Sequence, residues 1–450
     1  MTSAAKLRVL HTSDWHLGAS LYNYKRYAEF QAFLDWLIGT IQQEEIEILL
    51  ISGDIFDTTT PSNRAQELYY QFLCQVVKTS CRHVVITGGN HDSPTFLNAP
   101  KDLLKAFSIH VVGQATTDPA DEVILLKNQA GEPELLVLAV PYLRDRDLRT
   151  SLAGESATDK ENKLLAGLKQ HYAKVNACAA EILAKTGKPL PVITMGHLFT
   201  SGGKTLEGDG VRELYVGTLA QVTSDIFGEL PDYVALGHLH VPQKVQQQET
   251  IRYSGSPLPM GFNEAKQQKS LCLVEFVEKA PSVSLIDIPQ FRALASIKGN
   301  LDEIKQQIKA LMAAKSQALT EIIYDAAEEC PNLREEVNAI VKKAVMDART
   351  QAVNEMIFDY DHKECTNVRE KVDKIVEKAH LEILRIKNAS IAQALLQASH
   401  EDEQLVDLTV TEVFQRLLKA KNVAPEEQEE LLLTYQEAVQ NLLQEDTQAE

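Results

Sequence analysis

The sequence predicts an α/β protein, built as a sandwich or a doubly wound domain over roughly its first 288 residues. Two observations support this fold class. Short runs rich in leucine and β-branched residues alternate with longer stretches of helical period, and the runs are apolar at nearly every position, as in strands buried on both faces. The predicted strands, in chain order, are residues 7–12, 46–52, 83–87, 135–140, 192–195, 233–236 and 251–254.

Three helices and two further apolar runs complete this domain. Segment 27–42 carries apolar side chains on one face at helical spacing, and segments 63–79 and 160–185 are also predicted to be helical. The runs 270–277 and 283–288 close the domain. A chain of 450 residues is too long for one ordinary core, so we expect further domains after residue 288.

Beyond residue 288 the sequence changes to short strand and helix units with an internal repeat. Residues 330–344 match residues 365–379 at nine of fifteen positions, and the upstream segments 320–325 and 354–359 also resemble each other. A tandem duplication of one strand-plus-helix unit explains both matches. Two copies are too few for a solenoid, so we expect residues 289–395 to form a small α/β cap.

The sequence predicts a helical tail over residues 396–450. Thr409 and Glu412 form a capping box, and Pro425 suits the first turn of a second helix. Both segments carry an apolar stripe at helical spacing, and helices so polar on the other side need a surface that covers the stripe. Attachment to a partner is therefore favoured, and folding back onto the cap is the alternative.

The net charge of −18 opposes a simple nucleic-acid binder, because phosphate contacts need a basic surface. Most of the excess lies late in the chain. Residues 1–300 carry 28 Lys and Arg against 33 Asp and Glu, whereas residues 301–450 carry 17 against 30. The net charge therefore argues against a nucleic-acid substrate for the first part of the chain, but does not exclude one.

No apolar stretch approaches the roughly 20 residues that a membrane helix needs, and the first ten residues carry no signal-like run. The six cysteines are scattered without a Cys-x-x-Cys pair, so we expect reduced thiols rather than disulfides or a thiolate zinc site. A cytoplasmic protein with no membrane contact is expected.

Five predicted strands each end in a short loop rich in Asp, Asn or His. The ends contain Asp14-Trp-His16, Gly-Asp54-Ile-Phe-Asp57, Gly-Asn90-His91-Asp92, Gly-His197 and Gly-His238-Leu-His240. Ligands gather beyond the carboxyl ends of strands in an open α/β sheet, so these loops can converge. On an extended backbone, a spacing of two points both side chains of each Asp-x-His or His-x-His pair the same way. The glycines that precede four of the residues fit sharp backbone turns.

Oxygen and imidazole ligands without thiolate suit Mn, Fe or Zn, and seven or eight of them exceed the need of one ion. Two ions sharing a carboxylate can hold a phosphoryl group and lower the pKa of a bridging water. Each motif alone is more often structural, and Asp57 and Asp92 are equally consistent with helix or turn caps. Their combination, each behind an apolar strand, favours a two-metal phosphoesterase site.

The order of these five motifs resembles the calcineurin-like metallophosphoesterase superfamily. The longer strings at residues 10–18, 212–219 and 252–257 narrow the similarity to the SbcD family of nuclease subunits, over about residues 6–300 with a looser match near the C-terminal end. The resemblance implies a four-layer αββα sandwich with a smaller α/β cap and a C-terminal helical tail. The duplicated unit makes the cap longer than is typical of that family.

The resemblance also implies two metal ions that share one carboxylate, with Mn²⁺ as the usual ion and Mg²⁺ as a partial substitute. One ion would be held by Asp14, His16, Asp54 and His240. The other would be held by Asp54, Asn90, His197 and His238. His91 would bind no metal, but would stand over the scissile phosphate and stabilise its charge.

Three residues that follow the first metal loop, Tyr22, Lys25 and Arg26, are candidates for contacts with a nucleic-acid backbone. The resemblance implies an ATP-regulated double-strand exonuclease and single-strand endonuclease that acts on DNA ends and hairpins in DNA repair, recombination and replication at the nucleoid. Its tail would bind SbcC, an SMC-like ATPase, in a heterotetramer containing a nuclease homodimer. A metal site alone cannot choose between phosphate esters, so a cyclic-nucleotide phosphodiesterase or phosphoprotein phosphatase is the alternative. The complete ligand set argues against an inactive scaffold.

Overall fold

The computed structural model describes residues 6–149, 156–200, 222–326, 330–358 and 381–389, together with Leu418, Gln428, Leu431, Leu432 and Tyr435. The chain divides into two compact units, Met1–Ala293 and Leu294–Glu450. The predicted second repeat at 365–379, the string at 212–219, and nearly all of the predicted tail lie outside the described residues.

The first sheet of the first unit has the strand order β14-β13-β1-β4-β5-β6. Its strands are β1 (Leu7–Thr12), β4 (Ile48–Ser52), β5 (His83–Thr87), β6 (Ile109–Val112), β13 (Ser270–Val277) and β14 (Ala280–Asp287). Strands β1, β4, β5 and β6 pair in parallel, and β13 runs antiparallel to β1. The carboxyl ends of β1, β4 and β5 therefore open at the same edge of the sheet.

The second sheet has the order β11-β12-β10-β9-β8-β7. Its strands are β7 (Val123–Lys127), β8 (Pro133–Ala139), β9 (Val192–His197), β10 (Tyr233–Gly237), β11 (Gln243–Val245) and β12 (Gln248–Tyr253). Strands β8, β9, β10 and β12 are parallel, and the edge strands β7 and β11 are antiparallel to their neighbours. Strands β9 and β10 thus also end side by side.

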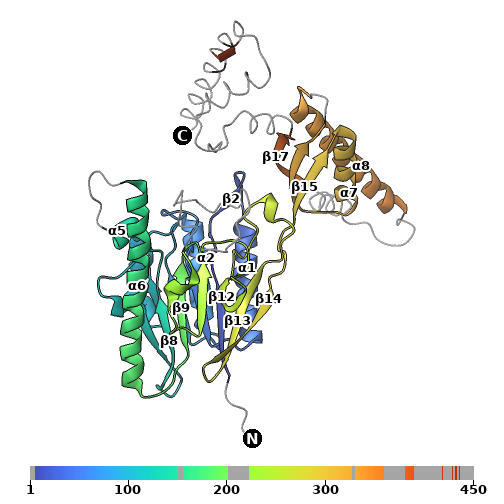
Figure 1. The fold of residues 1–450 in the computed structure, drawn as a ribbon. Helices are drawn as coiled ribbons and strands as arrows, with labels where there is room; N and C mark the ends of the chain where they lie inside the picture. Colours follow the sequence, from blue (N-terminus) through green and yellow to red (C-terminus); the bar gives the residue numbers. More distant parts are fainter. Residues whose placement is uncertain are drawn as a thin grey trace. The chain divides into compact units, whose positions relative to one another are not determined.

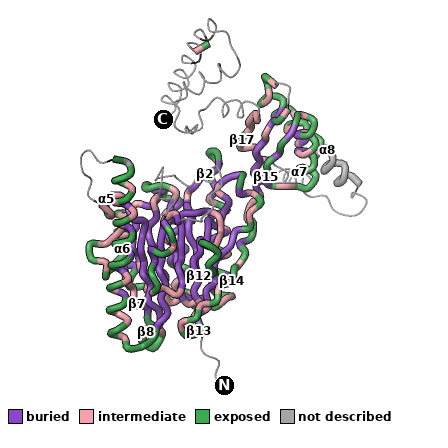
Figure 2. Tube along the Cα trace, in the orientation of Figure 1, coloured by how far each residue is buried: buried purple, intermediate pink, exposed green. Residues whose placement is uncertain are grey.

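Alternate side chains of the strands enter two different cores, which makes the unit a layered sandwich. Val9 and Leu50 of the first sheet pack against Val137 and Met195 of the second. On the other face of the first sheet lie helices α1 (Tyr27–Gln43) and α2 (Asn63–Val76), and α6 (Ala157–Thr186) covers the second sheet. Figure 2 shows the strands as the buried centre of this unit, and the predicted four-layer αββα sandwich is confirmed.

Strands at 7–12, 83–87 and 270–277 have the predicted bounds. The structure adds short elements that carry too few residues to show a period in the sequence. They are β2 (Ser20–Leu21), β3 (Tyr24–Lys25), β6, β7, β11, α3 (Pro94–Asn98), α4 (Lys101–Lys105), α5 (Asp145–Leu148), and the 3₁₀ turns η1 (Pro119–Glu122), η3 (Ser224–Phe227) and η4 (Phe262–Glu264). The cysteines 74, 81, 178, 272 and 330 are free thiols, as expected.

The second unit contains a parallel three-stranded sheet of β15 (Leu294–Gly299), β16 (Leu319–Tyr324) and β17 (Glu382–Asn388). Helices α7 (Leu301–Ala313) and α8 (Leu333–Phe358) supply the rest of its core. The strand predicted at 354–359 is wrong, because α8 continues through Phe358. The place beside β16 that a second strand would fill is taken by β17.

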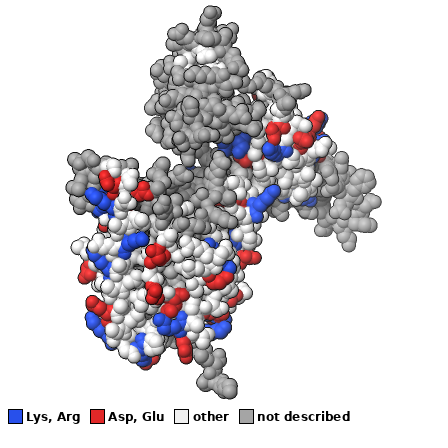
Figure 3. Space-filling view, in the orientation of Figure 1, with Lys and Arg blue, Asp and Glu red and all other residues white. Residues whose placement is uncertain are grey.

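Over the first unit, acidic and basic side chains are interspersed on the face drawn in Figure 3, and neither sign dominates. This matches the nearly balanced charge of residues 1–300. Among the described residues, no helix combines the length and apolar character needed to cross a membrane.

Candidate metal centre

The loops that follow β1, β4, β5, β9 and β10 meet, and they bring all seven predicted metal ligands together. Six of these residues are buried, and Asn90 is half-buried. Their burial has a cost, because ionised and polar groups lose water without gaining apolar contacts. Burial of these seven side chains is therefore expected only if opposite charges or hydrogen-bond partners at the centre offset this loss of water.

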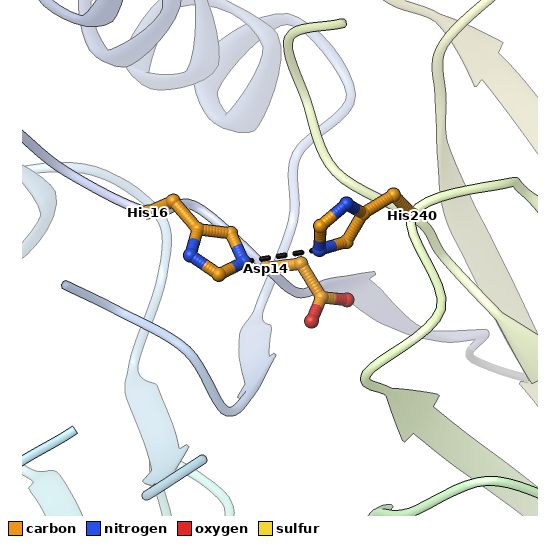
Figure 4. Close-up of side chains that lie close together, drawn as sticks. All are labelled: Asp14, His16 and His240. Atoms are coloured by element: carbon orange, nitrogen blue, oxygen red, sulfur yellow. Dashed lines mark hydrogen bonds between the residues drawn. The ribbon is translucent and has the colours of Figure 1, made fainter. Parts of the chain in front are cut away.

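One group consists of Asp14, His16 and His240, whose ligand atoms all lie within 4.8 Å of one another. The three side chains point toward a common space, with His16 Nε2 and His240 Nε2 facing each other at 3.1 Å (Figure 4). His16 Nε2 also lies 3.7 Å from Asp54 Oδ2. This is the set that the resemblance implied for one ion.

A second group consists of Asp54, His197 and His238, again within 4.8 Å. His197 Nε2 lies 3.2 Å from Asp54 Oδ2. Asn90 Oδ1 lies 3.0 Å from both His197 Nε2 and His238 Nδ1. Asp54 Oδ2 is thus close to imidazoles of both groups, the position that a shared carboxylate requires.

The spacing of these atoms fits divalent cations. Two ligand atoms about 2.0–2.2 Å from one ion, at tetrahedral or octahedral angles, lie about 3.0–3.6 Å apart. The distances within the two groups that involve His16, His197 and Asn90 are 3.0–3.7 Å. Carboxylate, amide and imidazole donors without thiolate suit Mn, Fe or Zn.

The backbone reason given for the paired motifs is wrong. Asp14 and His16 have φ of 52° and 47°, and His238 has φ of 102°, so these segments are not extended. The left-handed conformation, and not strand alternation, aims their side chains. His238 and His240 belong to different groups, whereas an extended backbone would point them the same way.

Glycines serve the centre mainly by allowing close approach. At Gly89, which does not have positive φ, a Cβ atom would lie 2.1 Å from Asp54 Oδ1. Gly53 has φ of +82°, and a Cβ there would lie 2.2 Å from His197 Nδ1. The predicted sharp turn therefore applies to Gly53, and the absence of a side chain is what matters at Gly89.

The charges of the metal-free centre form a buried ion pair. Burial opposes ionisation of Asp54, yet the neighbouring His197 holds the pKa of this carboxyl well below its usual value. Burial also opposes the charged form of His197, but Asp54 raises its pKa to about 9. Burial raises the pKa of Asp14 to about 6 and lowers that of His238, which lies beside charged His197, to about 3.

His91 is buried beside both groups but its ring makes a different contact. Its Nδ1 lies 2.8 Å from the backbone oxygen of Asp57, and its backbone N–H donates to Asp54 Oδ1 at 2.8 Å. Because a carbonyl oxygen only accepts, Nδ1 carries the proton in the neutral ring. The ring lies 4.8 Å from that of His16, edge to face.

The sequence left open whether Asp57 and Asp92 are helix or turn caps. The structure shows what each of them contacts. Asp57 Oδ1 lies 3.5 Å from His16 Nδ1, on the side of the ring away from His240. The carboxylate of Asp92 accepts hydrogen bonds from the backbone N–H groups of Ile55, Phe56 and Gly89. Asp92 thus ties the loop after β4 to the loop after β5, and Asp57 backs a proposed ligand, a role that its sequence context did not reveal.

The three residues predicted to contact the substrate differ in their exposure to solvent. Tyr22 is exposed and stacks on Phe262 at 5.8 Å, and Lys25 is exposed on β3. Arg26 is buried; its guanidinium donates to Pro259 O at 2.6 Å and pairs with Glu29. This contradicts the prediction for Arg26, whose charge is used inside the protein.

Comparisons with known proteins agree with this geometry. The calcineurin-like phosphoesterase family matches residues 7–242, and the type 5 capsule protein repressor C-terminal domain matches residues 290–357 and 360–422. The SbcD subunit of the nuclease SbcCD from Escherichia coli K12 is 32% identical over 428 residues, which cover 94% of this chain and 96% of that protein.

Two further relatives are SbcD subunits as well. The Rhodobacter capsulatus protein is 37% identical over 277 residues and the Bacillus subtilis protein 34% identical over 271, each match covering 60% of this chain and 66% of the relative. The chain therefore belongs to the calcineurin-like phosphoesterases and, among them, to the SbcD family, whose members are the metal-dependent nuclease subunits of SbcCD.

Proposed function

We propose that this chain hydrolyses phosphodiester bonds of DNA, as a double-strand exonuclease and a single-strand endonuclease at ends and hairpins, with two Mn²⁺ ions as its preferred cofactor. One observation carries the proposal: two buried ligand groups meet at Asp54, and a histidine outside both sets, His91, lies against them. The named nuclease relatives support DNA as the substrate.

When bound, two divalent ions would supply positive charge around a phosphate and lower the pKa of a water molecule. The chain's own residues do the rest. Asp14, His16 and His240 would hold one ion with Asp54, and Asn90, His197 and His238 would hold the other with Asp54.

His91 would act on the phosphate itself. Its Nδ1–H donates to Asp57 O, so in the doubly protonated imidazolium the Nε2–H would be the donor that stabilises the phosphate and passes its proton to the leaving oxygen. Tyr22 and Lys25, both exposed, are proposed contacts to the nucleic-acid backbone.

The substrate is tested by comparing hydrolysis of a labelled DNA hairpin with hydrolysis of cyclic AMP, both with Mn²⁺ and with the full chain. We expect cleavage of the hairpin and little turnover of the cyclic nucleotide. Preferential hydrolysis of cyclic AMP would instead assign the chain to the phosphodiesterase alternative. Replacing Mn²⁺ by Mg²⁺ in the same assay is expected to support only part of the rate.

The tail is proposed to bind SbcC, with two nuclease subunits in the complex. The match of the C-terminal family over 360–422 and the predicted helices after Thr409 support this. Ending the chain after residue 400 is expected to abolish co-purification with SbcC and leave Mn²⁺ binding intact. A shortened chain that still forms the complex at normal affinity would defeat the proposal.

A further inference from the structure

A buried ion pair lies directly behind one of the proposed ligands. Glu264, the last residue of η4, is fully buried, and Lys269, just before β13, is almost fully buried. Lys269 Nζ lies 2.5 Å from Glu264 Oε2. Such a pair is a weak source of stability, because removing two charges from water costs about as much as their attraction returns. A contribution to stability therefore does not explain why this ion pair is buried beside His240.

Lys269 connects the pair to the metal centre through the backbone. Its ammonium group donates to His240 O at 2.9 Å, to Ser256 Oγ at 3.2 Å and to Gln267 Oε1 at 3.2 Å. The same oxygen of His240 accepts from the backbone N–H of Ser256 at 3.1 Å. Glu264 Oε2 accepts in addition from Met260 N–H at 3.1 Å. Lys269 and the Met260 N–H therefore hold the same oxygen of the carboxylate, Oε2.

The second oxygen of this carboxylate faces the ring of His240. Glu264 Oε1 lies 4.0 Å from His240 Nδ1, while the opposite ring nitrogen, Nε2, faces His16 Nε2 at 3.1 Å. A neutral imidazole that gives Nε2 to a metal must carry its proton on Nδ1. At 4.0 Å the two atoms are beyond hydrogen-bonding distance, so the carboxylate acts through its negative charge, which favours a proton on the facing Nδ1.

The second ligand group is built differently. His197 Nδ1 lies 2.9 Å from the backbone oxygen of Ser52, a neutral acceptor. His240 instead has a buried carboxylate at its back, with Glu264 Oε1 4.0 Å from its Nδ1. The two groups thus differ in the charge that supports their histidines.

We propose that Glu264, fixed by Lys269, is a positioning residue that holds His240 in the Nδ1–H tautomer and orients its Nε2 toward the ion of the Asp14–His16–His240 group. This rests on the ligand set proposed above. Glu264 does not touch substrate or ion, and its effect should be confined to the affinity of that one metal position.

The experiment titrates the metal-free full chain with Mn²⁺ by calorimetry. Glu264→Gln is expected to weaken one of two binding steps about 10- to 100-fold, the range typical of groups that hold metal-binding histidines. Because this variant leaves Lys269 charged without its partner, the double variant Glu264→Gln/Lys269→Met is measured as well and should show the same loss. In a His240→Ala background, Glu264→Gln should cause no further loss.

Glu122→Gln is the matched control. Glu122 is likewise fully buried and faces an imidazole, with His171 Nε2 at 2.8 Å, but it lies in η1 and away from the ligands. It should leave both Mn²⁺ affinities unchanged. Wild-type affinities in Glu264→Gln, or an equal loss when His240 is already alanine, would overturn the positioning role. Unchanged Mn²⁺ binding in His240→Ala alone would overturn the ligand set, and this inference with it.

Discussion

Replacing Gly89 by alanine is expected to disable the metal centre although every ligand remains in the chain. A Cβ at this position would lie 2.1 Å from Asp54 Oδ1 and 2.3 Å from the backbone nitrogen of Asp54. The second of these atoms belongs to the backbone, so rotation of a side chain cannot relieve the contact. Reaching an ordinary separation requires a shift of about 1 Å or more, borne by the loops after β4 and β5.

The size of the effect follows from that displacement. Overpacking of this kind costs about 1–3 kcal/mol of stability. A misplacement of about 1 Å at a reacting centre costs about 10²-fold in rate. Asp54 Oδ2 lies near imidazoles of both ligand groups, so we also expect weaker binding of both ions. The variant should fold, bind Mn²⁺ poorly, and cleave at about one hundredth of the normal rate or less.

The assay combines thermal unfolding, metal content after dialysis against Mn²⁺, and hairpin cleavage. Gly39→Ala is the control, because a Cβ at Gly39 in α1 meets nothing within 4 Å. In a helix interior this exchange should stabilise the protein by about 0.5–1 kcal/mol and leave cleavage unchanged. A Gly89→Ala protein with two bound ions and full activity would refute the close-approach reasoning.

Four further predictions concern the ligands and their protons. His91→Ala should keep near-normal metal content and lose about 10²-fold or more in cleavage, as for other groups that act on a transition state; a wild-type rate would remove His91 from the mechanism. Asp54→Ala should lose both metal and activity, and two retained ions, counted by elemental analysis, would contradict the shared carboxylate. The pKa of His197 is raised to about 9, so at pH 7 the metal-free ring is charged, and Mn²⁺ binding should release close to one proton. Calorimetry in buffers of different ionisation enthalpy measures this release, and a heat that does not vary with buffer would exclude it. The raised pKa of His197 also adds to the free energy of unfolding of the protein without metal below about pH 6.5. This contribution to stability should be lost as the pH rises toward 9.

The sequence was sufficient to predict which seven candidate ligands lie together, because the sheets bring them together in a simple way. Strands β1, β4 and β5 are parallel neighbours, and so are β9 and β10. The polar residues that follow them must therefore meet at the carboxyl edges. Apolar runs locate such strands well, since burial on both faces leaves few other compositions.

The contacts behind the ligands could not be predicted in the same way. Asp57 lies in a loop and Glu264 ends a 3₁₀ turn of three residues, so neither segment is long enough to show a period that would indicate the direction of a side chain. An arginine is usually exposed to solvent, and the sequence around Arg26 gives no sign of burial. In the fold its guanidinium points toward Pro259 O and Glu29. Such outcomes depend on how segments distant in sequence pack together, which local composition does not encode.

The backbone around the two ligand groups is strained at four residues and is tied together by hydrogen bonds. Asp14, His16, Asp54 and His238 all have positive φ, and a conformation of this kind costs a non-glycine residue about 1–3 kcal/mol. The loops that carry them are interlocked by hydrogen bonds from Asp14 N to Gly53 O, from His16 N to Asp54 O, and from His238 N to Asp14 Oδ1.

These bonds also fix the two carboxylates. Asp54 Oδ1 accepts from His91 N–H, which leaves Oδ2 as the atom facing His16 and His197. Asp14 Oδ1 accepts from His238 N–H in the same manner. Asp54 thus uses one oxygen to hold its place and directs the other toward the ligand groups, whereas the second oxygen of Asp14, Oδ2, accepts from the Ser13 hydroxyl at 2.6 Å. Because the orientation is set by the folded chain, little ordering remains to be done when an ion binds, and strain at four residues is the cost of that preorganisation.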